Sequence, residues 1–173
     1  MRPTPWFDRT FPTLTDPGLL PGLIERLAGT AVRLDELRVA YDEKQWKQRT
    51  TDQWSQQEHL GHLLNLEPLW LARMHDILTE KEYLTTADLT NTATFAARYN
   101  EQNTDDLLAQ FDAARDLLVE LLVDVDASDC TQSALHPRLK TPMTLLDLAY
   151  FVAEHDDHHL ATIRQLGRPP TLS

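Results

Sequence analysis

The chain has 173 residues, enough for one domain of ordinary size and too few for two, so a single domain over residues 1–173 is expected. Its 16 basic and 27 acidic residues give a formal net charge of −11 at pH 7, which makes nucleic acid and anionic membrane surfaces poor partners. One cysteine, Cys130, excludes an internal disulfide framework and a zinc site of the Cys₄ or Cys₂His₂ type.

The first predicted helix begins near Asp16-Pro17-Gly18. Residues suited to an interior then recur at steps of three, four and seven, which is the spacing of a helix packed in a bundle. These residues are Leu20, Leu23, Leu27, Thr30, Leu34, Leu37 and Tyr41.

The second predicted helix runs from about Ser55 to Thr79. Ser55 and Glu58 have the spacing of a capping box, in which each residue satisfies the backbone N–H of the other. A wide apolar face follows, made of Leu60, Leu63, Leu64, Leu66, Trp70, Leu71, Met74, Ile77 and Leu78.

The third predicted helix begins near Thr104, after a long connection over residues 80–103 with a short helix around Thr94–Asn100. Its expected interior positions are Phe111, Ala114, Leu118, Leu121 and Val125. Spacing by three and four again indicates a helix packed on others.

The fourth predicted helix has Thr141 as its N-cap and Pro142 at its first position, and Gly167 ends it. Its interior positions are Leu145, Leu148, Val152, His155, His159, Thr162 and Leu166. Because no run alternates with period two, the prediction is an all-α protein, a four-helix bundle with long connections between helices.

His155 and His159 occupy interior positions of this last helix, and residues four apart project from the same face. Two imidazoles placed in this way can bind one divalent metal, each through one ring nitrogen. The alternative is an exposed pair without a metal. A third ligand would come from the second helix, where periodicity slightly favours His59 over His62.

Two strings resemble the signatures of the DinB/YfiT-like superfamily, and their order and separation of roughly 90 residues match as well. The first is Trp54-Ser55-Gln56-Gln57-Glu58-His59-Leu60-Gly61-His62-Leu63, followed by Glu67. The second is Glu154-His155-Asp156-Asp157-His158-His159-Leu160-Ala161-Thr162-Ile163. The resemblance implies a four-helix bundle that holds a divalent metal on His62, His155 and His159, with His62 in place of His59. His158 matches the second string at a position that is not a ligand.

Three histidine ligands leave coordination positions open to water or substrate. The resemblance implies either a metal-dependent hydrolase or a transferase that uses a low-molecular-weight thiol, acting on a small-molecule substrate. The metal could be Zn, Ni, Fe or Mn. The alternative is a non-catalytic bundle, which could be a homodimer, in which the metal has a structural role. A zincin-like use of Asp156 as general base, from the HDxxH spacing, is a weaker alternative.

Glu67 falls on the apolar arc of the second helix, five residues after His62. It could orient a ligand imidazole or act as a base, or it could pair with Arg73 or Arg164. The basic stretch at residues 136–140 could lie over the pocket and bind a carboxylate, although a solvated loop is favoured.

The N-terminal residues contain no uninterrupted apolar stretch of the signal-peptide type. No segment approaches the roughly 18 apolar residues of a membrane span. The expected location is therefore the cytoplasm.

Overall fold

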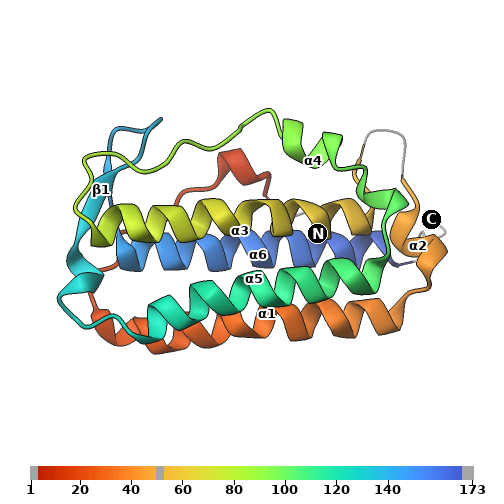
Figure 1. Ribbon diagram of the computed structural model, residues 1–173, viewed down its shortest axis with the longest axis horizontal. Helices are drawn as coiled ribbons and strands as arrows, with labels where there is room; N and C mark the ends of the chain where they lie inside the picture. The colour runs from red at the N-terminus through yellow and green to blue at the C-terminus, as the bar shows by residue number, and fades with distance from the viewer. Residues whose placement is uncertain (1–3, 50–52, 169–173) are drawn as a thin grey trace.

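A computed structural model describes residues 4–49 and 53–168. Its four long helices are α1 (Leu20–Ala40), α3 (Gln56–Leu78), α5 (Thr104–Val123) and α6 (Leu145–Leu166). Both α1 and α3 pack against α5 and α6 (Figure 1). The successive long helices α1 and α3 therefore lie diagonally opposite each other in the bundle, as do α5 and α6. The structure confirms the predicted all-α four-helix bundle.

Shorter elements connect the long helices. They are η1 (Trp6–Asp8), η2 (Pro17–Leu19), α2 (Glu43–Lys47), α4 (Thr92–Ala96), η3 (Tyr99–Glu101), η4 (Asp129–Thr131), β1 (Ser133–Leu135) and β2 (Pro142–Thr144). The two strands pair as an antiparallel hairpin, and each is too short to show alternation in the sequence. No helix within the described ranges is long and apolar enough to cross a lipid bilayer.

The start of α3 follows from its capping box, as predicted. The backbone N–H of Glu58 donates to Ser55 Oγ at 3.1 Å, and the backbone N–H of Ser55 donates to Glu58 Oε2 at 2.9 Å. Two N–H groups that have no partner within the helix are thereby satisfied. Because this cap fixes the first turn, it also fixes the direction in which the histidines of that turn project.

The start of α6 differs from the prediction. Thr144, not Thr141, is the N-cap: Asp147 N–H donates to Thr144 Oγ1 at 3.0 Å, and Thr144 N–H donates to Asp147 Oδ2 at 3.1 Å. Pro142 lies in β2 opposite Leu135 instead of in the first helical turn. The hairpin and the capping box together satisfy more backbone groups than a cap at Thr141 with a proline after it.

The interior face of α1 is as predicted from Leu20 to Leu37. On α5 the structure confirms Phe111 and Leu118, and the other predicted positions differ. Ala114, Leu121 and Val125 are only partly buried. The buried positions are Thr104, Leu107, Phe111, Arg115, Leu118 and Leu122. An arginine at a central position of this face was not expected, because burying a guanidinium without partners is costly.

Arg115 has partners on each of the other three long helices. Its Nε and Nη2 donate to the carboxylate of Glu67 on α3, at 3.0 and 2.5 Å. Nη1 donates to the carbonyl of Leu27 on α1 at 3.2 Å, and Nη1 and Nη2 both reach Asp156 on α6. One guanidinium therefore contacts every long helix of the bundle.

Candidate metal centre

Three buried imidazoles meet between α3 and α6. His62 projects from α3, and His155 and His159 project from α6, with one ring nitrogen of each within 4.8 Å of the others. The Nε2 atoms of His155 and His159 are 3.2 Å apart. Two nitrogens bound to one tetrahedral zinc at 2.0–2.1 Å lie about 3.4 Å apart, so this spacing fits a shared ion.

The outward nitrogens of two of these rings are already engaged. His62 Nδ1 lies 3.3 Å from the Thr94 hydroxyl, and His159 Nδ1 lies 2.8 Å from His59 Nδ1. These contacts leave the Nε2 atoms of His62 and His159 free to bind an ion. His155 Nδ1 is buried and has no hydrogen-bond partner among the described residues.

The histidines are neutral at physiological pH because burial disfavours the charged ring. Burial lowers the pKa of His62 to about 4, and burial with the nearby His62 and His158 lowers the pKa of His59 to about 4. The pKa values of His155 and His159 also lie well below the ordinary range, first because of burial and then because of neighbouring rings. Neutral imidazole is the form that binds metals, so the donor set suits a divalent cation.

The structure places His59 and His158 beside this group but outside it. His59 contacts the outer nitrogen of His159 and is therefore behind a candidate ligand. His158 is half-buried, with Nδ1 3.5 Å from Arg9 Nη2 and its ring 5.3 Å from that of His159. The group that can share one ion contains His62, as the family resemblance implies, and not His59, which periodicity favoured.

Glu67 is buried and both of its oxygens accept from Arg115. Burial raises the pKa of Glu67, and the adjacent guanidinium of Arg115 opposes that shift. Its partner is neither Arg73 nor Arg164, the two arginines that the sequence suggested. The contacts that the structure describes join Glu67 to the bundle interior instead of to a histidine ring.

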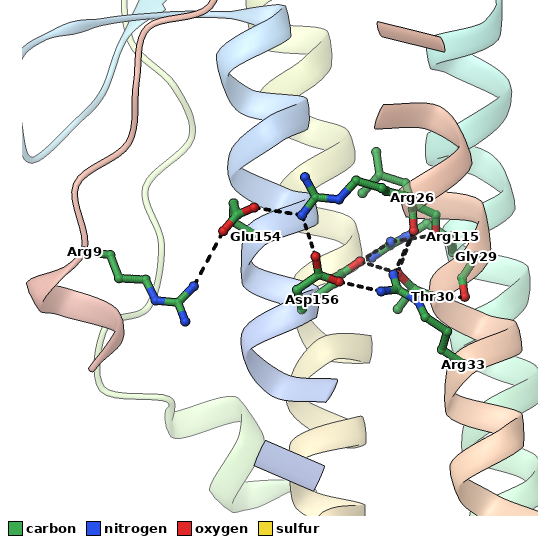
Figure 2. Close-up of polar contacts among 10 residues, drawn as sticks. Arg9, Arg26, Gly29, Thr30, Arg33, Arg115, Glu154 and Asp156 are labelled. Carbon is green, nitrogen blue, oxygen red and sulfur yellow. Dashed lines mark hydrogen bonds and ion pairs between the residues drawn. The ribbon is translucent and has the colours of Figure 1, made fainter. Parts of the chain in front are cut away.

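The side of α6 that faces α1 carries carboxylate side chains (Figure 2). Thr30 Oγ1 donates to Asp156 Oδ2 at 2.8 Å, and Arg26 donates to Glu154 at 2.8 Å. Arg26 and Arg33 both donate to Asp157, each at 2.5 Å. The side chains next to the candidate ligands His155 and His159 are therefore anchored to α1, and this fixes the rotation of α6.

The imidazole group opens into a cleft of about 1180 Å³. The N-terminal segment, the connection after α3, the β1–β2 hairpin, α3 and α6 all contribute to its wall. Aromatic rings lie beside the candidate ligands. The ring centroid of Trp54 is 4.9 Å from that of His62, and those of Trp6 and Trp70 are 4.9 and 5.7 Å from that of His155. The wall beside the candidate ligands is therefore largely aromatic, as is common in sites that bind small molecules.

All five residues of the basic stretch at 136–140 line this cleft. The favoured interpretation as a solvated loop is therefore incomplete, because Arg138 and Lys140 are exposed and still face the cavity. The hairpin brings the stretch there: His136 N–H donates to the Thr141 carbonyl at 2.9 Å and closes the loop between the two strands.

Sequence reasoning missed Thr94, Trp6 and Arg115 as parts of the site and its support. Arg115 had a usable signal, because it lies at helical spacing from Phe111 and Leu118. Thr94 and Trp6 had none, since both lie in short elements, α4 and η1, that reach the histidines only through the tertiary fold.

A sequence model described as the DinB superfamily matches residues 26–163. Among solved structures, YfiT from Bacillus subtilis, described as a probable metal-dependent hydrolase with an unusual four-helix bundle topology, has 18% sequence identity. The alignment covers 91% of each chain with a TM-score of 0.77, which shows a shared fold. No curated protein matches the chain.

Proposed function

The chain belongs to the DinB superfamily, and we propose that it is a metal-dependent hydrolase acting on a small molecule bound in the cleft. One divalent cation, Zn, Ni, Fe or Mn, would be held by His62, His155 and His159. The observation that carries this proposal is that the three imidazoles converge at the wall of a large cleft. A cation there would face substrate instead of protein.

The fold supplies what such a reaction needs from the chain. When bound, a divalent cation supplies Lewis-acid chemistry, polarising a substrate oxygen and lowering the pKa of a water molecule. Thr94 and His59 hold the outer nitrogens of two ligand rings and so orient them. Trp6, Trp54 and Trp70 wall the site and exclude bulk water. Arg115 donates to both oxygens of Glu67, so the proposal does not rely on Glu67 as a base.

A thiol-dependent transferase is the second candidate, and the size of the cleft favours it. Ligand pockets commonly enclose about 300–1,000 Å³, whereas this cleft encloses about 1180 Å³. That volume could hold a low-molecular-weight thiol beside a second substrate. The thiol would come from a bound molecule, because Cys130 is buried away from the cleft and burial raises its pKa.

A purely structural metal would need a filled coordination sphere. Within the described ranges, no carboxylate or cysteine joins the three-histidine group. This arrangement favours an open position and therefore a reaction. Assembly into a homodimer stays a prediction, which sedimentation of the purified protein would test.

Elemental analysis of the purified protein tests the ligand assignment. We expect one divalent metal per chain, lost in the variants His62→Ala, His155→Ala and His159→Ala. His158→Ala is the matched control on the same helix and should retain the metal. Metal retained in His155→Ala and lost in His158→Ala would contradict the assignment.

Activity separates the two candidates. Protein reconstituted with each metal would be assayed against ester, amide and phosphoester substrates, with and without added low-molecular-weight thiols. Hydrolysis without thiol that disappears in His155→Ala supports the hydrolase. Turnover that requires a thiol, with the thiol joined to the product, supports the transferase instead.

A further inference from the structure

Arg73 is a buried cation on the wall of the cleft. Its side chain lies on α3, only 3% of the residue surface is exposed, and it lines the cavity. Its Nε donates to the Thr85 carbonyl at 2.9 Å. The oxygens of nearby Asp76 are taken up by Lys81 and Thr85, at 2.6–2.7 Å, and no described carboxylate forms an ion pair with Arg73. A guanidinium buried in this way leaves donors without an anionic partner.

Other cations gather at the same end of the cleft. His136, Arg138 and Lys140 line the same cleft as Arg73, and the backbone N–H of Arg138 donates to His136 Nδ1 at 3.3 Å. Lys140 Nζ lies 4.4 Å from the centroid of the Tyr83 ring. Among the described residues, neither Arg138 nor Lys140 has a carboxylate partner. This concentration of positive charge contrasts with the net charge of −11 of the whole chain.

The acidic residues of the cleft wall bind other partners than these cations. Asp88 accepts hydrogen bonds from the backbone N–H groups of Thr90 and Thr92. Asp147 accepts from the backbone N–H groups of Leu14 and Thr144. Among the described residues, neither Asp88 nor Asp147 forms an ion pair with Arg73, Arg138 or Lys140, so the donors of these cations are not taken up by the acidic residues of the cleft wall.

We propose that Arg73, Arg138 and Lys140 form a subsite for the carboxylate of the substrate. The planar fork of an arginine matches a carboxylate, and a partly dehydrated site strengthens the ion pair. This inference rests on the proposed function, because it assigns the rest of the substrate to the three-histidine group.

The spacing of the two sites defines the substrate class. The Trp70 ring lies 5.6 Å from Arg73 Cζ and 5.7 Å from the His155 ring, so one indole separates the cationic end from the histidines. The wall between them is apolar, with Leu66, Leu69 and Phe151 beside Trp70. The expected substrate is a small carboxylic acid whose apolar body separates the acid from the group that reacts.

Calorimetric titration with 4-phenylbutyrate and its uncharged amide tests the subsite on the protein as purified. We expect the carboxylate to bind about tenfold more tightly than the amide. Arg73→Met should remove this preference, and Arg138→Met, at an exposed position of the hairpin loop, should reduce it about threefold or more. Arg98→Met is the control, because Arg98 is exposed, pairs with Glu101 and lies outside this cleft.

Three results would overturn the subsite: equal binding of the two probes, no binding of either, or an unchanged preference in both variants. The last result would place the carboxylate elsewhere, for instance on the metal. If Arg73→Met fails to fold by circular dichroism, Arg138→Met alone decides. Metal content, measured in parallel, distinguishes the two proposals, because protein that lacks metal but prefers the carboxylate would refute the hydrolase and keep the subsite.

Discussion

At the scale of single residues, a hydrogen bond to the outer nitrogen of a candidate ligand ring decides which nitrogen is free to face an ion. Thr94 makes this contact for His62 at 3.3 Å, from a short helix in the connection after α3. Outer partners of metal ligands typically contribute 10- to 100-fold to metal affinity. If His62 binds the proposed metal, Thr94 is expected to strengthen that binding without touching the ion.

Replacing Thr94 by valine keeps the shape of the side chain and removes the hydroxyl. We expect Thr94→Val to bind metal 10- to 100-fold more weakly, measured by competition with a chromophoric chelator. Thr92→Val, on the exposed side of the same helix, is the matched control and should bind metal normally. Equal affinities of the two variants would show that Thr94 does not orient His62.

The lowered pKa values of the histidines predict how the metal-free protein responds to acid. His59 and His62 have pKa values of about 4 in the folded state, below the ordinary 6.5. Between these pH values the unfolded chain binds protons that the folded chain does not. The contribution of these imidazoles to the free energy of unfolding is therefore fully present above pH 6.5 and is lost as the pH falls towards 4. The loss is on the order of 3 kcal/mol for each imidazole.

Urea unfolding of chelator-treated protein at pH 7, 6 and 5 measures this loss. The variant His59→Gln removes one of the two groups and should show a shallower decline than the parent. If the parent and the variant decline in parallel, His59 does not resist protonation in the folded state.

At the scale of elements, the segment that carries Thr94 is held on α3 by a close approach at Gly61. A Cβ at position 61 would overlap the ring of Tyr99, whose hydroxyl donates to Asn65 Oδ1 at 2.6 Å. Asn65 Nδ2 in turn donates to the Thr94 hydroxyl at 3.2 Å. Because Gly61 has no side chain, the segment that carries Thr94 and Tyr99 can pack closely on α3 between His59 and His62.

Gly61→Ala should therefore destabilise the protein by roughly 1–3 kcal/mol, although alanine favours helices. Gly29→Ala is the matched control, because Gly29 lies inside α1 with nothing within 4 Å of its added Cβ. That change should stabilise by roughly 0.5–1 kcal/mol. Thermal or urea unfolding of the pair measures both, and a stabilised Gly61→Ala would mean that Tyr99 moves aside freely.

The long helices could be predicted from the sequence because burial leaves a periodic pattern, as in α1 from Leu20 to Leu37. Short elements leave too few residues for a period. The five-residue α2 was missed, although Asp42 and Gln45 have capping-box spacing. The start of α6 was misplaced because Thr141-Pro142 and Thr144 with Asp147 both have helix-start chemistry, and only the pairing of β1 with β2 decides between them.

The site was predictable to the extent that its residues lie on long helices. His155 and His159 follow from the pattern of α6, and their carboxylate neighbours turn toward α1 as helix geometry requires. The third histidine came from the family resemblance, because His59 and His62 both fall near the apolar arc of α3. The cleft itself depends on loops such as residues 136–140, whose positions no local pattern encodes.

At the scale of the whole molecule, a network of arginines and carboxylates joins the helices. Arg115 is 1% exposed and binds Glu67 and Asp156, which are equally buried. Removing one partner from such a group leaves buried charges uncompensated and typically costs 3–5 kcal/mol. Ion pairs at the surface contribute about 1 kcal/mol or less.

Arg115→Met should therefore lower the free energy of unfolding by about 3–5 kcal/mol. Arg38→Met is the matched control, because Arg38 also joins α1 to α5, through a 2.9 Å contact with the exposed Asp105. We expect the control to lose less than about 1 kcal/mol in the same chemical denaturation. Similar losses in the two variants would show that the buried network is no more stabilising than a surface pair.

Because Arg115 contacts all the other long helices, it also affects how the helices align when the chain collapses during folding. Leucine-rich faces tolerate sliding past one another, so a compact intermediate with one helix displaced by a turn would bury nearly as much apolar surface. Such an intermediate would also bury a guanidinium or a carboxylate without its partner, which raises its free energy strongly. A chain without this cation is expected to linger in such collapsed forms, with native far-ultraviolet dichroism, weakened tryptophan signals and strong binding of hydrophobic dyes.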